Sequence, residues 1–125
     1  MHELLVTQNI LEIALRHAQK VGAIRIIHLQ IVIGQLSSIF DDSVAFYWDI
    51  ISKDTLAEAS QLSFQRNPAK LNCMDCEFEY LLVENRLACP ICEGSNIATS
   101  SGEEFYLDWI EIEDQEDIKE LTPLN

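Results

Sequence analysis

Basic residues are scarce in this sequence. Its 125 residues include 8 Lys and Arg against 21 Asp and Glu, which gives a formal net charge of −13. A chain with this charge repels phosphate backbones, so the composition argues against nucleic-acid binding. Long apolar runs are also missing, since no stretch approaches the roughly 18 to 20 apolar residues that a membrane span needs. We therefore expect no nucleic-acid partner and no membrane partner.

The N-terminus lacks the basic region that opens a signal peptide and carries Glu3 and Glu12 instead. This absence predicts a cytoplasmic, reducing location. Hydrophobic residues make up 48% of the chain, as in globular proteins. The length allows one domain with a substantial core and one small satellite unit.

Familiar catalytic motifs are absent too. Ser37 and Ser38 have no GxSxG context, and the three histidines fit no catalytic triad. No GxxxxGK[ST] motif is present, so the chain should not hydrolyse GTP itself. The sequence predicts a protein that is not an enzyme.

Apolar periodicity indicates the elements of the main part of the chain. Residues 3–21 have an apolar stripe at helical spacing, formed by Leu4, Leu11, Leu15 and Ala18 and flanked by Ile10 and Ala14. Gly22 follows as a C-cap. Residues 23–33 alternate as a strand does, with one face formed by Ile27, Leu29, Ile31 and Ile33.

A second helix should begin at Asp41 or Asp42, either of which can serve as N-cap. Strands are expected at 61–66 and 104–112. The apolar phase of the last strand shifts between Trp109 and Ile110, which indicates a bulge or burial on both faces.

Residues 67–102 differ from the rest of the chain. They hold all four cysteines, two of the three prolines and two of the four glycines, and they lack sustained periodicity. We predict a discontinuous α+β domain (1–66 plus 103–113), an inserted unit (67–102) and an acidic C-terminal tail (114–125). The tail is expected to be solvated and partly disordered, or to dock on a basic partner.

The four cysteines form two CxxC pairs separated by twelve residues, Cys73/Cys76 and Cys89/Cys92. Each CxxC turn places two sulfurs where they reach one metal ion at about 2.3 Å. The intervening residues supply a hairpin that turns near Glu84-Asn85 and is filled by Tyr80, Leu82 and Leu87. This spacing is typical of a zinc ribbon. A closed four-thiolate site has no open position, so its role is structural.

Four other interpretations of the cysteines remain. Disulfides would need an oxidising compartment, and a redox CxxC should open a helix in a βαβ unit. Rubredoxin-type iron uses similar knuckles and would make an electron carrier. A zinc-ribbon module of a nucleic-acid or transcription assembly would need a basic face, but residues 67–102 carry a net charge of −3, from Lys70 and Arg86 against five acids.

A second metal site is suggested by the N-terminus, Met1-His2-Glu3. The α-amino group, the first backbone amide nitrogens and the His2 imidazole can converge on one ion. This nitrogen-rich, near-planar set suits Ni(II) or Cu(II).

Three motifs occur together here: Met1-His2-Glu3, Ile33-Gly34-Gln35-Leu36-Ser37 and the paired CxxC knuckles. In this combination the chain resembles the HypA/HybF family of hydrogenase maturation proteins, which are nickel metallochaperones, over about residues 1–113. The resemblance implies a mixed sheet covered by two helices, with a zinc domain inserted before the last strand.

The resemblance also implies the metal sites and partners. Nickel would be bound by His2, with Glu3 contributing through its backbone and as a further side-chain ligand. Asp41 or Asp42 could also contact nickel, although the N-cap role is favoured. Zinc would be bound by Cys73, Cys76, Cys89 and Cys92. The implied partners are a GTP-hydrolysing nickel maturation protein, the [NiFe]-hydrogenase large subunit and urease assembly proteins.

Overall fold

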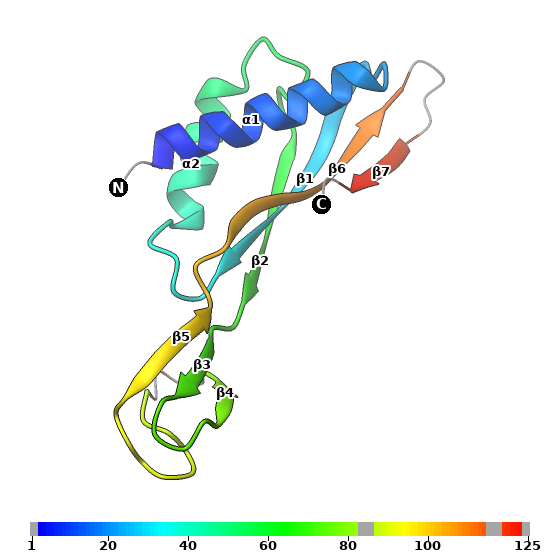
Figure 1. The fold of residues 1–125 in the computed structure, drawn as a ribbon. Coiled ribbons are helices and arrows are strands. Elements are labelled where there is room, and N and C mark those ends of the chain that lie inside the picture. The colour runs from blue at the N-terminus through cyan, green and yellow to red at the C-terminus, as the bar shows by residue number, and fades with distance from the viewer. Residues whose placement is uncertain (1–2, 83–86, 115–118, 124–125) are drawn as a thin grey trace.

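The chain forms two sheets and two helices, and the computed structural model describes residues 3–82, 87–114 and, for the backbone, 119–123. A four-stranded sheet has the order β2-β1-β6-β7 and a three-stranded sheet the order β4-β3-β5 (Figure 1). The elements are α1 (Glu3–Lys20), β1 (Arg25–Gly34), α2 (Asp41–Ile51), β2 (Gln61–Asn67), β3 (Lys70–Cys73), β4 (Glu79–Leu81), β5 (Ile97–Ser101), β6 (Phe105–Glu113) and β7 (Lys119–Pro123).

The expected α+β class is confirmed. Strand β1 runs parallel to β2, to which it is joined through α2, and antiparallel to β6. Both helices pack on the larger sheet, and together they bury one apolar core. Its fully buried members are Ile10, Ala14, Ala18, Ile26, Leu29, Ile31, Ile33, Val44, Trp48, Ala57, Leu107, Ile110 and Ile112.

Helix α1 follows the predicted span, but its buried face is rotated from the predicted stripe. Its buried residues are Thr7, Ile10, Ala14 and Ala18, whereas Leu4 is exposed. The small alanines let the helix approach the sheet closely, so the larger leucines lie at the edge of the contact. Gly22 ends the helix as expected: its φ is +75°, and the N–H groups of Gly22 and Ala23 donate to the carbonyls of Gln19 and Ala18.

The prediction that Ile27 belongs to the buried face of β1 is wrong. Ile26, not Ile27, is fully buried. The pairing of β1 with β6 shifts register between Ile26 and His28, so Ile27 is the extra residue of a bulge and the alternation changes phase there.

The bulge predicted between Trp109 and Ile110, in the strand that is β6 of the structure, is confirmed close to the expected position. The register shifts between Gln30/Trp109 and Ile31/Leu107, which leaves Asp108 as the extra residue on β6. Buried positions therefore move from Leu107 to Ile110 and Ile112.

Helix α2 begins where expected, but its N-cap is Phe40, which makes no side-chain capping bond. Asp41 and Asp42 lie in the first turn instead, where carboxylates interact favourably with the helix dipole. The Asp41 carboxylate accepts a hydrogen bond from the Asp42 N–H at 3.1 Å and pairs with Arg66 at 3.4 Å.

The expected solvated and partly disordered tail (114–125) contains a strand that was not predicted, at residues 119–123. Strand β7 pairs antiparallel with β6, from Glu113↔Lys119 to Trp109↔Pro123. Leu121 is the single aliphatic residue of this strand, so the sequence carries little strand signal among the surrounding acids. As a result, the inserted unit lies before the penultimate strand and not before the last one.

The two sheets join at a tightly packed connection between β2 and β3 and between β5 and β6 (Figure 1). The loop after β1 holds both connections: Gly34 N–H donates to Glu104 O at 2.7 Å, Gln35 N–H to Asn67 O at 2.8 Å and Leu36 N–H to Gly102 O at 2.7 Å. The Gln35 side chain also accepts from Ala69 N–H at 2.8 Å. We call residues 34–36, 67–69 and 102–104 the waist.

Candidate metal sites

The four cysteine sulfurs converge on one point of the inserted unit. Sγ atoms of Cys73 and Cys92 are 3.6 Å apart, as are those of Cys76 and Cys89, and all four lie within 4.8 Å of one another. A tetrahedron of 2.3 Å zinc–sulfur bonds has edges of about 3.8 Å. The donor set and spacing therefore fit one zinc ion bound by four thiolates. Among the described residues this is the single cluster of His, Cys, Asp and Glu that could hold a metal.

The two CxxC knuckles have the same backbone geometry. In each, the fourth residue after the first cysteine has a positive φ, Glu77 at 64° and Glu93 at 59°. The N–H of that residue donates to the carbonyl of the first cysteine, at 2.8 Å for Cys73 and 2.9 Å for Cys89. A positive φ costs a residue with a side chain about 1–2 kcal/mol. The backbone is therefore strained at two matched positions, and this conformation directs the sulfurs inward.

The thiols also differ electrostatically when no metal is bound. Burial opposes the Cys89 thiolate, but the N–H groups of Cys92 and Ile91 point at its sulfur and lower the Cys89 pKa to about 7. At Cys76 the Phe78 N–H favours the thiolate, but burial and the neighbouring thiols raise its pKa to about 12. Hydrogen bonds among the sulfurs thus favour the thiolate at Cys89 and oppose it at Cys76, whereas a bound cation would stabilise all four thiolates.

Zinc affinity should fall as the pH falls. Each thiol that is protonated in the metal-free cluster must lose its proton on binding, so each lowers the apparent affinity about tenfold per pH unit. Above pH 7 Cys89 is already ionised, and below pH 7 it adds to this proton count. We expect a steeper loss of affinity below pH 7, which zinc competition with a chelator from pH 8 to pH 6 would measure. An unchanged slope through pH 7 would contradict the assignment of the low pKa to Cys89.

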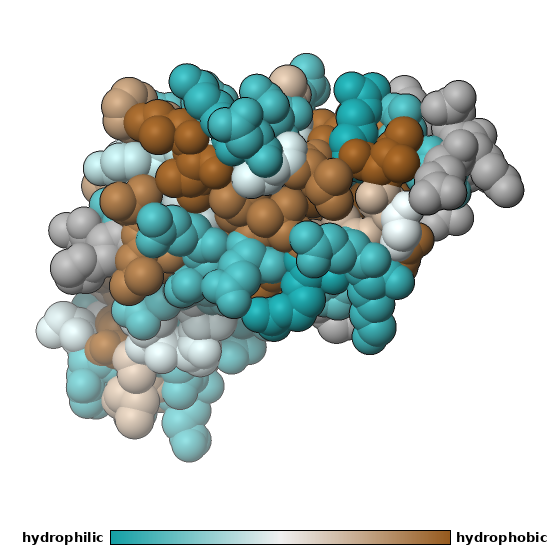
Figure 2. All heavy atoms as spheres, turned by 90° about the horizontal axis from the view of Figure 1, so that it is seen from above, coloured by the Kyte–Doolittle hydropathy of each residue, from teal (hydrophilic) through white to brown (hydrophobic). Residues whose placement is uncertain are grey.

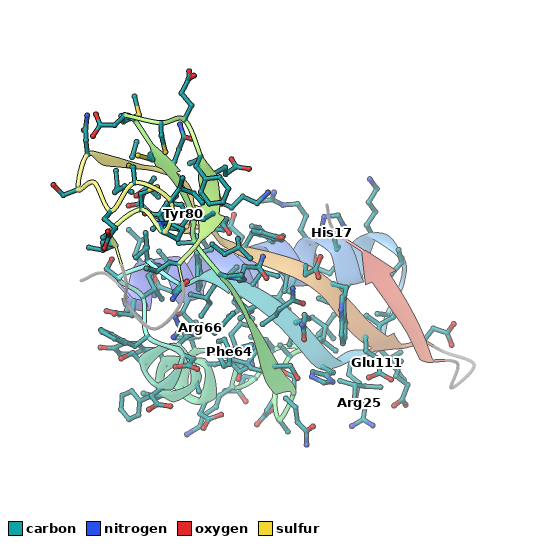
Figure 3. The ribbon with its side chains drawn as sticks, turned by 90° about the horizontal axis from the view of Figure 1, so that it is seen from below. His17, Arg25, Phe64, Arg66, Tyr80 and Glu111 are labelled. Atoms are coloured by element: carbon teal, nitrogen blue, oxygen red, sulfur yellow. The ribbon has the colours of Figure 1, made fainter. Side chains whose placement is uncertain are left out.

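The hairpin expected between the knuckles is partly wrong. Among the described residues, strand β4 pairs with β3 alone. Tyr80 is half-buried and Leu82 is buried, as expected, but Leu87 is exposed. The Tyr80 hydroxyl donates to the Leu87 carbonyl at 2.5 Å, and Figure 3 shows Tyr80 inside the inserted unit. The predicted turn at Glu84-Asn85 lies outside the described residues.

The proposed nickel ligand His2 also lies outside the described residues. Glu3 is the first residue of α1 and is half-buried. Its carbonyl accepts a hydrogen bond from the Thr7 hydroxyl at 2.5 Å. Asp41 and Asp42 belong to no group of described residues that could bind a metal.

The remaining histidines have structural surroundings. His28 hydrogen-bonds through Nε2 to the Ser63 hydroxyl, and its ring meets the Trp109 ring edge-on at 5.3 Å. His17 lies in the last turn of α1 (Figure 3), where a cation is favourable.

Sequence reasoning missed the role of the loop after β1. The motif Ile33–Ser37 suggested a family but no function for its residues. Gly34, Gln35 and Leu36 hold both connections between the sheets. The available signal was a glycine at the end of an otherwise apolar strand, which often marks a close backbone approach.

One family model and several known proteins match this chain over most of its length. The family model described as hydrogenase/urease nickel incorporation, metallochaperone, hypA matches residues 1–112. A hydrogenase maturation factor HypA of Dehalococcoides mccartyi is 35% identical over 115 residues, 92% of this chain and 97% of that protein. Hydrogenase maturation factor HybF of Salmonella typhimurium is 31% identical over 113 residues, 90% of this chain and 100% of that protein.

A solved structure supports the fold. The solution structure of the Ni metallochaperone HypA from Helicobacter pylori superposes with a TM-score of 0.65 at 21% identity, covering 92% of this chain and 100% of that one.

Proposed function

The chain belongs to the HypA family of hydrogenase and urease nickel-incorporation metallochaperones, and on that premise we propose that its nickel site is the N-terminus, with His2 as the principal side-chain ligand and Glu3 as a second contributor. It is a nickel metallochaperone for hydrogenase maturation, with four cysteines that fit a structural zinc site. The residues that bind nickel are the part we propose.

The observation that carries this proposal is the start of α1 at Glu3. The first N–H groups of a helix have no partner within it, so amide nitrogens at this end can bind a metal without breaking helical hydrogen bonds. The helix dipole places partial positive charge here and opposes a cation, but the Glu3 carboxylate offsets that charge. A terminal site with few ligands also suits release to a partner.

Replacing His2 with alanine should abolish stoichiometric Ni(II) binding, because the imidazole is the one strong side-chain nitrogen donor at the terminus. Titration of untagged protein with Ni(II), followed by calorimetry and absorption, measures this effect. A tag on the α-amino group would change the proposed ligands.

The matched control is His17→Ala, which removes the other histidine near α1 from its last turn. This variant should bind nickel as the parent does. Tight nickel binding retained by His2→Ala would overturn the N-terminal assignment. Loss of nickel binding in His17→Ala would instead place the nickel site at the end of α1.

The role in maturation implies hydrogenase-related partners. More specifically, we propose delivery to the [NiFe]-hydrogenase large subunit beside a GTP-hydrolysing nickel partner, and a contribution to urease assembly. The absence of a phosphate-binding GxxxxGK[ST] motif supports a separate GTP-hydrolysing protein.

We further propose that the chain catalyses no reaction, acts in the cytoplasm and folds as two units, residues 1–66 with 103–113, whose sheet β7 extends, and residues 67–102. The family is one of metallochaperones, and a four-thiolate site has no open position for substrate. Four free thiols fit a reducing compartment. No helix in the described part of the chain is long and apolar enough to span a membrane. The two sheets with separate cores support the division into units.

A nucleic-acid zinc ribbon is not favoured as an alternative. Among the described residues between 67 and 102, the basic residue is Lys70, against Asp75, Glu77, Glu79 and Glu93. A ribbon that binds a phosphate backbone needs the opposite balance.

A further inference from the structure

Four large apolar side chains surround the cysteine cluster on the outside. Each lies within two residues of a zinc-ligating cysteine, and each is between 39% and 66% exposed. We call this group the knuckle surface: Met74, Phe78, Leu87 and Ile91.

These side chains are exposed because the unit has little apolar core to recruit them. That core consists of Ala69, Leu71 and Leu82, with Tyr80 and Ile97 packed against it. Within each CxxC turn the sulfurs point inward, so the residues between them point outward. Met74 and Ile91 are such residues, and metal binding would hold them in place without burying them.

The residues of the knuckle surface all lie next to the sulfur cluster along the chain. The four sulfurs lie within 4.8 Å of one another, and each apolar residue is one or two positions from a sulfur-bearing residue. The Phe78 ring stacks on Tyr80 at 6.1 Å, and the Tyr80 hydroxyl bonds to the carbonyl of Leu87. The Ile91 N–H points at the Cys89 sulfur at 3.4 Å. The Ile91 N–H therefore contacts a sulfur of the cluster, and Phe78 and Leu87 are connected to each other through Tyr80.

The charges around this surface are acidic. Exposed carboxylates alternate with the apolar residues along the chain, at Asp75, Glu77, Glu79 and Glu93. An anionic membrane or nucleic acid would be repelled, and a second copy would bring the same acids face to face. An apolar patch with an acidic rim instead complements a protein segment whose apolar side chains are flanked by Lys or Arg.

The exposed apolar side chains of α1 lack this pattern. Figure 2 shows apolar residues on the face of the main domain seen from above, and those of α1 include Leu5 and Ile13. The α1 surface carries charges of both signs, including the Glu12–Arg16 pair at 2.9 Å. It therefore does not select the charge of a partner.

We propose that the knuckle surface is a docking site for a basic, apolar-anchored segment of a partner protein. In this arrangement a bound zinc ion would also fix the positions of the docking side chains relative to one another. The inference does not depend on nickel binding, and its test uses protein without nickel.

The test measures binding of short labelled peptides to the zinc-loaded full chain by fluorescence anisotropy. One peptide alternates leucine with lysine, a second replaces lysine with glutamate and a third replaces leucine with serine. Only the first should bind. The double variant Phe78→Ser/Ile91→Ser should weaken its binding about tenfold or more, as expected for buried interface anchors, with zinc content unchanged.

Two control variants make the result specific. Phe46→Ser/Ile50→Ser removes exposed apolar side chains of α2 and should leave peptide affinity unchanged. Glu77→Gln/Glu93→Gln should weaken binding and reduce its salt dependence, whereas Asp49→Asn/Glu58→Gln should not. The proposal would be overturned by an equal loss of peptide affinity in Phe46→Ser/Ile50→Ser or by unchanged affinity in Phe78→Ser/Ile91→Ser. Binding of the glutamate peptide would also overturn it.

Discussion

Replacing Cys73 with serine is expected to abolish zinc binding and unfold the inserted unit while the main domain stays folded. Cys73 is fully buried at the end of β3 and supplies one of four thiolates. The apolar core of this unit has three fully buried residues, too few to order the chain around it. Zinc binding supplies roughly 10–16 kcal/mol in isolated zinc-finger peptides, so its loss should exceed what the remaining core provides.

Metal analysis and an amide NMR spectrum would report both parts of this result. Signals from residues 70–101 should collapse, while those of α1, β1 and β6 stay dispersed. Met74→Ser is the matched control, since it lies in the same knuckle but is exposed and donates no ligand; it should keep one zinc. Full zinc content in Cys73→Ser would exclude the four-thiolate site, and unfolding of the whole chain would exclude two separable units.

Replacing Gly34 with alanine should destabilise the chain by about 3 kcal/mol, at the upper end of the usual cost of overpacking. A Cβ built on Gly34 lies 2.2 Å from the Gly102 carbonyl oxygen and 2.3 Å from its carbon. These atoms cannot withdraw easily, because Leu36 N–H donates to the same oxygen and Gly34 N–H donates to Glu104 O, both at 2.7 Å. The substitution therefore forces the waist apart.

Urea unfolding of the zinc-loaded protein would measure this loss, with Gly22→Ala as the comparison. Gly22 has a φ of +75°, and a Cβ there meets no atom within 4 Å. Its substitution should cost about 1–2 kcal/mol from backbone strain alone. If Gly34→Ala were no more destabilising than Gly22→Ala, close packing at the waist would not contribute to stability.

The predictable parts of this molecule are those with local signals. The CxxC spacing identifies the sulfur cluster because each turn depends on four consecutive residues, and Gly22 ends α1 through its own backbone freedom. The alternation of β1 also predicts a strand. It fails at Ile27 because the bulge there depends on β6, more than 80 residues away.

The unpredicted parts depend on distant partners. Strand β7 exists through its pairing with β6, and the acidic residues before it suggest a tail when the sequence is viewed alone. Phe40 caps α2 although Asp41 is the better capping residue by type, and the Asp41 carboxylate is paired with Arg66 of β2. The contact of Gly34 with Gly102 joins residues that no sequence pattern connects.

The strand order of the larger sheet also has a consequence for synthesis on the ribosome. Its central strand β1 pairs with β6, and this pairing includes Arg25↔Glu113. The sheet therefore cannot close until Glu113 has been synthesised. The inserted unit needs only residues up to Gly102. Because domains fold as units while the chain emerges, the cysteine-rich unit is complete before β6 has been made. We therefore expect the inserted unit to acquire zinc before the larger sheet has closed.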